Sequence, residues 1–99
     1  MSEKLINKLR NLLDENLFEE VIDYCNQALI DTKQFDAHTL AQIYCAKGLA
    51  KDELEDRSEA IKNFNLAIKI DSEYSIAYGY RGYSYYFLKD YESAITNTF

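Results

Sequence analysis

The sequence predicts an all-α fold of stacked helical hairpins, and three observations support this prediction. Proline is absent and glycine occurs only three times in 99 residues, so few residues would interrupt a helix. Hydrophobic residues make up 47% and charged residues 28%, which is typical of a globular protein. The sequence also matches itself at a shift of 34 positions, which indicates a repeated structural unit. This length suits a single domain, so we expect residues 1–99 to share one fold.

The internal match pairs residues 41–65 with residues 75–99 without a gap, and seven of the 25 paired positions are identical. The identical pairs are Tyr44 and Tyr78, Gly48 and Gly82, Leu54 and Leu88, Asp56 and Asp90, Ala60 and Ala94, Ile61 and Ile95, and Asn63 and Asn97.

The first helix of each copy carries one recurring stripe. Tyr44, Gly48 and Lys51 follow the spacing i, i+4, i+7, which places them on one face of an α-helix. The second copy repeats this spacing with Tyr78, Gly82 and Tyr85. A glycine in such a stripe lets another helix approach closely, so we expect this face to pack against the second helix of its own hairpin.

The second helix of each copy should begin at an aspartate. Asp56 and Asp90 are suited to accept hydrogen bonds from the first free backbone N–H groups of a helix, and Glu59 completes a capping-box pattern after Asp56. The hairpin turn is therefore expected just before each aspartate. Ala60, Phe64 and Ala67 have the spacing of a buried face.

The N-terminal region contains a more divergent copy. Leu9 stands at the place of Gly48, and Val21 at the place of Ala60. The 39 residues from Ala28 to Ala67 imply about five extra residues around Asp31 to Ala37. Asn16 is suited to a left-handed helix stop. In chain order, the predicted helices are residues 2–14, 18–31, 37–53, 57–70, 74–88 and 91–98.

These residues and this period resemble the tetratricopeptide repeat, a 34-residue helix–turn–helix unit with aromatic, glycine and alanine residues at set intervals. The resemblance implies an α-solenoid of three such repeats and about six helices, stacked as a right-handed superhelix. The repeats would span about residues 2–40, 41–74 and 75–99, with the last one truncated. The departures are Lys51 for the second aromatic, Arg57 where the next copy has Tyr91, Ser72 for the closing proline and Thr98 for an aromatic residue.

The resemblance further implies a non-catalytic module that binds a partner peptide or helix on a concave face lined by the first helix of each repeat. The residues expected on that face are Arg10, Gln42, Cys45, Leu49, Ile76, Tyr80, Tyr83 and Tyr86.

Tyrosine is concentrated at the C-terminal end, where seven of nine lie between residues 74 and 91. Tyr80, Tyr83 and Tyr86 fall on a different side of the fifth helix from the Tyr78 stripe. These rings are either core residues covered by neighbouring helices or aromatic anchors facing the groove. Both interpretations remain open at this stage.

The same resemblance limits the choice of partner. One binding subtype of the family grips a chaperone's C-terminal carboxylate with Lys, Asn and Arg side chains, but here those positions hold Ile6, Arg10, Ala46, Ile76 and Tyr80. Because only Arg10 could hold an anion, we expect no chaperone-tail binding of this kind. An apolar, aromatic or basic segment is expected instead, since Asp52 would make one end of the groove acidic.

No arrangement of residues suggests catalysis, a cofactor or a metal site. His38 is interpreted as a surface residue, and Cys25 as a small buried hydrophobe. Cys45 is expected to face the groove as a neutral thiol, because nothing nearby would lower its pKa. The acidic cluster near the turn is interpreted as solvated; it consists of Asp52, Glu53, Glu55 and Asp56.

The net charge of −6 and pI of about 4.7 disfavour nucleic acid, which attracts clustered Lys and Arg. The sequence shows no secretion signal and no apolar stretch of about 18 residues, so no membrane association is expected. A cytoplasmic location is the simplest expectation. Two alternatives to peptide binding remain: self-association through an uncapped aromatic C-terminal repeat, or an origin as the N-terminal part of a longer repeat array.

Overall fold

The computed structural model describes the backbone of residues 2–98 and the side chains of residues 2–88. This part of the chain is all-α, as predicted. Its elements are α1 (Ser2–Asp14), α2 (Phe18–Ala28), a 3-10 helix (Thr32–Gln34), α3 (Ala37–Glu53), α4 (Arg57–Ile70) and α5 (Ser75–Thr98).

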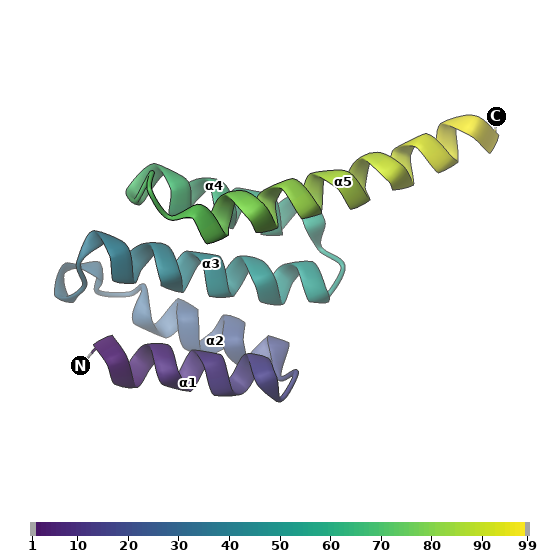
Figure 1. The fold of residues 1–99 in the computed structure, drawn as a ribbon. Coiled ribbons are helices and arrows are strands. Elements are labelled where there is room, and N and C mark those ends of the chain that lie inside the picture. Colours follow the sequence, from purple (N-terminus) through teal and green to yellow (C-terminus); the bar gives the residue numbers. More distant parts are fainter. Residues whose placement is uncertain (1, 99) are drawn as a thin grey trace.

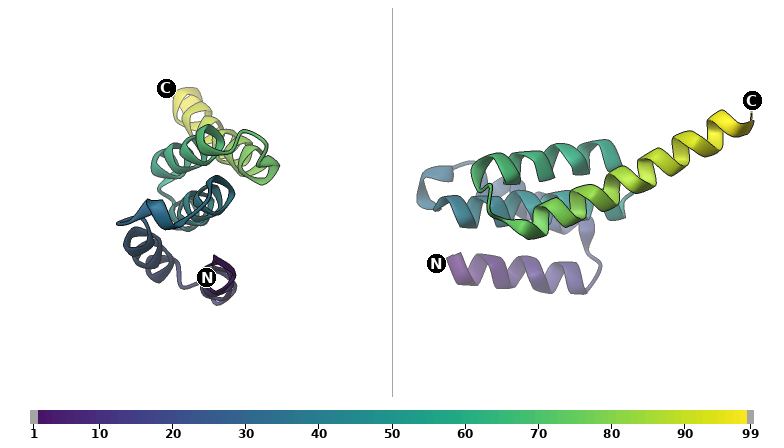
Figure 2. Two further views of the ribbon diagram at one scale, coloured as in Figure 1. Left: turned by 90° about the vertical axis from the view of Figure 1, so that its left-hand side faces the viewer. Right: turned by 45° about the horizontal axis from the view of Figure 1, so that its top comes forward.

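The helices stack as neighbouring hairpins (Figure 1). Helices α1, α3 and the first half of α5 lie along one side, and α2 and α4 lie along the other (Figure 2). Helix α3 is central and contacts α1, α2, α4 and α5. The first helix of each predicted repeat therefore contributes to one common surface.

Two hairpin turns are made by the same backbone device. Asn16 and Glu55 end α1 and α3 with φ angles of 61° and 66°. In each turn the backbone N–H of the next residue donates a hydrogen bond to the carbonyl oxygen five residues earlier. Leu17 N–H donates to Leu12 O at 2.9 Å, and Asp56 N–H donates to Lys51 O at 2.9 Å. This pattern is a Schellman motif, which satisfies carbonyl groups at a helix end. The predicted stop at Asn16 is confirmed.

Aspartates cap the starts of the 3-10 helix, α3 and α4, whereas α2 has Leu17 at its N-cap and no side-chain hydrogen bond there. The Asp36 carboxylate accepts from the Thr39 N–H at 2.8 Å and the Asp56 carboxylate from the Glu59 N–H at 3.4 Å, so both act as N-caps. Asp31 caps the 3-10 helix, which lies within the expected insertion. Helix α2 ends at Ala28, three residues earlier than predicted.

Close packing between α3 and α4 depends on Gly48. A Cβ atom at this position would lie 2.6 Å from Cε1 of Phe64, far inside ordinary contact distance. Phe64, Ala60 and Ala67 are fully buried, as the spacing predicted. In the divergent copy, Leu9 and Val21 are also buried, in a core shared by α1, α2 and α3.

The predicted sixth helix is wrong, because residues 91–98 continue α5 without a break. Residue 90 lies inside this 24-residue helix and therefore begins no new one. A left-handed, non-glycine residue such as Glu55 costs about 1–2 kcal/mol, and at α3–α4 the packing of Phe64 offsets that cost. Thr98 occupies the matching place in the last copy, so a closed hairpin there would bury less apolar surface.

No helix in residues 2–98, α5 included, is long and apolar enough to cross a membrane.

Candidate functional site

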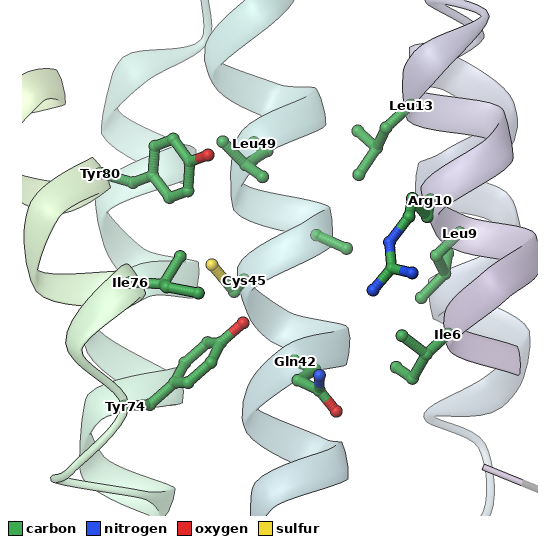
Figure 3. Close-up of a pocket in the computed structure, with 11 residues that line it drawn as sticks. Ile6, Leu9, Arg10, Leu13, Gln42, Cys45, Leu49, Tyr74, Ile76 and Tyr80 are labelled. Atoms are coloured by element: carbon green, nitrogen blue, oxygen red, sulfur yellow. The ribbon is translucent and has the colours of Figure 1, made fainter. Parts of the chain in front are cut away.

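An open groove runs between α1, α3 and α5 and encloses about 160 Å³ (Figure 3). Six of the eight residues expected on the concave face line it together. They are Arg10, Gln42, Cys45, Leu49, Ile76 and Tyr80.

Helix α1 forms the first wall. Ile6, Arg10 and Leu13 recur at i, i+4 and i+7, so they share one helix face, and all three line the groove. Arg10 is the only charged residue among the lining residues. Within residues 2–88 no carboxylate lies within ion-pair distance of its guanidinium group. The donors of Arg10 therefore remain available to a ligand at this wall.

Helix α3 forms the floor through Gln42, Cys45 and Leu49. Burial raises the pKa of the Cys45 thiol to about 12, and a hydrogen bond with Tyr74 lowers it in part. Burial also raises the pKa of Tyr74 to about 12. At neutral pH the thiol is therefore uncharged, in agreement with the expected neutral contact.

Helix α5 forms the second wall. Ile76 and Tyr80 line the groove and are 53% and 40% exposed. The Tyr80 ring lies against Phe64 with centroids 6.0 Å apart and an interplanar angle of 21°. This contact orients the ring at the edge of the groove while leaving part of it free.

Tyr83 and Tyr86 lie outside this groove. Tyr83 borders a second, shallower hollow on α5 together with Ile76, Gly79 and Tyr80. The rings of Tyr83 and Tyr86 pack edge-on against Phe87 at centroid distances of 4.6 and 5.6 Å. Both rings are mostly exposed, so the interpretation of these tyrosines as core residues is wrong.

The stripe of Tyr78, Gly82 and Tyr85 is exposed as well. We expected it to pack inside the third hairpin, and this prediction is wrong because α5 continues where the second helix should begin. Arg81 covers part of one ring, with its guanidinium carbon 5.2 Å from the centroid of Tyr78.

The acidic end expected for the groove is also wrong, because Asp52 is engaged elsewhere. Its side chain is only 12% exposed. The carboxylate accepts from Arg57 Nη1 at 2.8 Å and from the buried Ser84 hydroxyl at 3.0 Å. Asp52 is thus a structural residue that joins α3 to α4 and α5, and it is not part of a solvated cluster.

His38 and Cys25 are placed as expected. His38 is on the surface, with its side chain 61% exposed and Nδ1 3.0 Å from the Asp71 carboxylate. Cys25 is fully buried, its thiol lies 3.5 Å from Ile43 O, and burial raises its pKa to about 12. Within the described residues, no group of three or more His, Cys, Asp or Glu side chains has metal-binding geometry.

Five groove residues were not among the eight expected on the concave face, although two of them, Ile6 and Ala46, stand at the clamp positions; the five are Ile6, Leu9, Leu13, Ala46 and Tyr74. The i, i+4, i+7 spacing around Arg10 could have indicated Ile6 and Leu13. Tyr74 precedes α5 by one residue, and no periodic pattern marks a residue in that connection.

Comparison with known proteins gives one match. A family model described as tetratricopeptide repeat matches residues 41–74, which comprise α3 from its fifth residue, α4 and the connection to α5. The match covers the copy in which Gly48 packs against Phe64. Comparisons with curated proteins and with solved structures found no significant match. Residues 41–74 are therefore similar to a tetratricopeptide repeat.

Proposed function

We propose that this chain binds a segment of another protein along the groove between α1, α3 and α5. The observation that carries the proposal is that six residues from three helices, each expected on the concave face from the sequence, line one hollow. Binding of proteins or peptides is the general role of tetratricopeptide repeats, and the proposal assigns that role to this surface.

The size and lining of the groove suit a single apolar anchor. An apolar cavity of about 150 Å³ admits a benzene ring, and the groove is of similar size at about 160 Å³. Leu13, Leu49 and Ile76 offer aliphatic contacts, while the Tyr80 ring offers a stacking surface. A Leu, Phe or Tyr side chain of the partner would fill this space.

Charge determines what should flank the anchor. Arg10 would donate to a backbone carbonyl or another acceptor of the partner beside α1. The surrounding protein is acidic, with a net charge of −6, so basic residues farther from Arg10 would be attracted over longer distances. The preferred partner is therefore an apolar or aromatic anchor with basic flanking residues.

Fluorescence anisotropy with labelled synthetic peptides tests this proposal. The peptides would carry one Phe anchor or an Ala in its place, with either Lys or Glu flanks. The Phe peptide with Lys flanks should bind best, and its affinity should fall as salt is added. The proposal fails if the Ala peptide binds equally well or if no peptide binds.

A matched pair of variants locates the binding surface. Ile76→Glu places a charge in the groove, whereas Ile30→Glu makes the same change at an isoleucine that is 83% exposed and outside the groove. We expect Ile76→Glu to weaken binding at least tenfold and Ile30→Glu to leave it within about twofold, which corresponds to more than ~1.4 kcal/mol against ~0.4 kcal/mol. Equal effects of the two variants would place binding elsewhere. Circular dichroism would verify that both variants remain folded.

A further inference from the structure

Helix α5 docks on the α3–α4 hairpin in the way that α3 docks on the α1–α2 hairpin. In α3, Ile43 and Ala50 are fully buried in the core shared with α1 and α2. The matching places in α5, 34 residues later, hold Ala77 and Ser84, and these two side chains are fully buried as well. One face of α5 is therefore covered as the corresponding face of α3 is.

A second stripe of α5, made of Tyr78, Gly82 and Tyr85, is not covered by the other described helices. The two rings are 42% and 49% exposed. A Cβ atom added at Gly82 would meet nothing within 4 Å, whereas one at the matching Gly48 would lie 2.6 Å from the Phe64 ring. Residues 91–98 continue α5, so they do not fold over this stripe. We name these three residues the open face of α5.

Helix α4 shows which side chains cover the matching face of α3. Ala60, Phe64 and Ala67 recur at i, i+4 and i+7, so they share one side of α4, and all three are fully buried in a cluster with residues of α3. Phe64 fills the space in front of Gly48, and the small residues before and after it let the two helices approach closely. The covering pattern is thus a small residue, an aromatic residue four positions later and a second small residue three positions after that.

We propose that the open face of α5 binds a helix of another protein that carries this small–aromatic–small pattern. The bound helix lies antiparallel to α5, as α4 lies antiparallel to α3 (Figure 1). Its aromatic side chain enters the space in front of Gly82, between the rings of Tyr78 and Tyr85, where contacts between rings add to the apolar burial. The partner thereby supplies the second helix of a hairpin like α3–α4.

Covering the open face desolvates little charge. Arg81 is the one charged residue in 75–88. Its Nη1 donates to Asn65 Oδ1 of α4 at 3.0 Å, and its guanidinium carbon lies 5.2 Å from the centroid of the Tyr78 ring, so the charge is held at the rim. Tyr85 stands where α3 has Lys51. The open face is therefore more apolar than the face that α4 covers, and the desolvation of charge opposes binding little.

The open face is separate from the groove between α1, α3 and α5. Ile76 and Tyr80 line the groove, and they point about 160–200° around α5 from Tyr78. A helix on the open face therefore leaves the groove accessible, and binding at one surface does not require binding at the other.

The chain's own α4 sequence provides a probe for the open face. A labelled synthetic peptide of residues 56–70 carries the pattern in Ala60, Phe64 and Ala67. Fluorescence anisotropy with the full chain should show binding of this peptide, and Phe64→Ala in the peptide should weaken binding about tenfold or more. Absence of binding, or equal binding of the two peptides, would overturn the proposal.

Two variants of the full chain locate the bound peptide. Gly82→Leu fills the space on the open face, whereas Gly79→Leu adds the same side chain beside the groove residues Ile76 and Tyr80. Both variants should remain folded, because neither glycine has a neighbour within 4 Å of an added Cβ and leucine favours a helix more than glycine does. Circular dichroism would verify this.

The two variants should differ clearly in their affinity for the peptide. Gly82→Leu should weaken binding about tenfold or more, and Gly79→Leu should leave it within about twofold. The reverse order would place the peptide in the groove. Binding that Gly82→Leu does not weaken would show that the peptide lies elsewhere, for example in the place of α4. Either result contradicts the proposal.

Light scattering separates a foreign helix from a second copy of the chain. Without the peptide, the chain should keep its monomer mass of 11.6 kDa across a concentration series. A dimer that Gly82→Leu dissociates would show that a second copy covers the open face, and it would overturn the proposal.

Discussion

The two copies of the repeat carry the same Tyr and Gly at matching places of their first helices, Tyr44 and Gly48 in one and Tyr78 and Gly82 in the other. They nevertheless adopt different structures. In the first, residues 41–70 close into the α3–α4 hairpin, with Phe64 packed on Gly48. In the second, residues 75–98 form one straight helix, and Gly82 has open space in front of it. The first helix of a repeat therefore does not determine whether its hairpin closes. Whether the hairpin closes depends on the turn and on the size of the side chains that the second helix packs against the first.

The largest expected effect comes from removing the Phe64 side chain that packs on Gly48. Phe64→Ala leaves a cavity against Gly48 and should lower the free energy of unfolding by about 3–5 kcal/mol. Urea denaturation followed by circular dichroism would measure it. Leu66→Ala, on the same helix but 41% exposed, should cost much less. If the two variants lost equal stability, packing on Gly48 would not be what holds the first hairpin closed.

The two glycines should respond with opposite signs to the same substitution. Gly48→Ala forces a Cβ atom against the Phe64 ring and should destabilise the protein by about 1–3 kcal/mol. Gly82→Ala meets no neighbour and should stabilise the monomer by about 0.5–1 kcal/mol through helix propensity. Urea denaturation of dilute protein tests the pair. A loss of stability in Gly82→Ala under these conditions would mean that its face is already covered in the monomer.

The last expected effect is alkaline destabilisation, which arises in the closed part of the molecule. The pKa of the Cys25 thiol is raised from 9.0 to about 12 by burial, so the folded state keeps a proton that the unfolded state releases above pH 9. Stability should therefore be unaffected below pH 9 and fall between pH 9 and 12. From pH 8 to pH 10 this one thiol should contribute a loss of about 1.4 kcal/mol.

Denaturation of the unmodified chain and of Cys25→Ala at both pH values would isolate that contribution. The variant should lose less stability than the unmodified chain between pH 8 and pH 10. Equal losses in the two proteins would assign the alkaline sensitivity to other groups, such as Cys45 and Tyr74, whose pKa values are also raised to about 12.

Local patterns were sufficient to predict most of the fold. The 34-residue repeat and the apolar spacing located α1, α3 and α4, and Asn16 and Asp56 marked a stop and a start that the structure confirms. These features depend on residues close together in the chain. The same reasoning failed at Asp90, because an aspartate begins a new helix only where the packing of that helix offsets the cost of the turn before it.

The groove was partly predictable for a related reason. Residues on the first helices could be assigned to one surface from the repeat register, so Arg10, Gln42 and Tyr80 were found together. Asp52 was misplaced because its partners, Arg57 and Ser84, come from two other helices and lie 5 and 32 residues away. A pairing between residues on different helices leaves no mark in the periodicity of any one helix.

The hydrogen bonds of Asp52 also have a mechanical consequence. The carboxylate links α3 directly to Arg57 of α4 and Ser84 of α5, and Arg57 in turn lies over the Phe87 ring, 4.9 Å from its centroid. A pull along the axis of α5 by anything attached to its far end would load these contacts in shear before it stretched the connection at residues 71–74. The force would therefore pass into the middle of the helical stack, so that α3, α4 and the first half of α5 would resist it together.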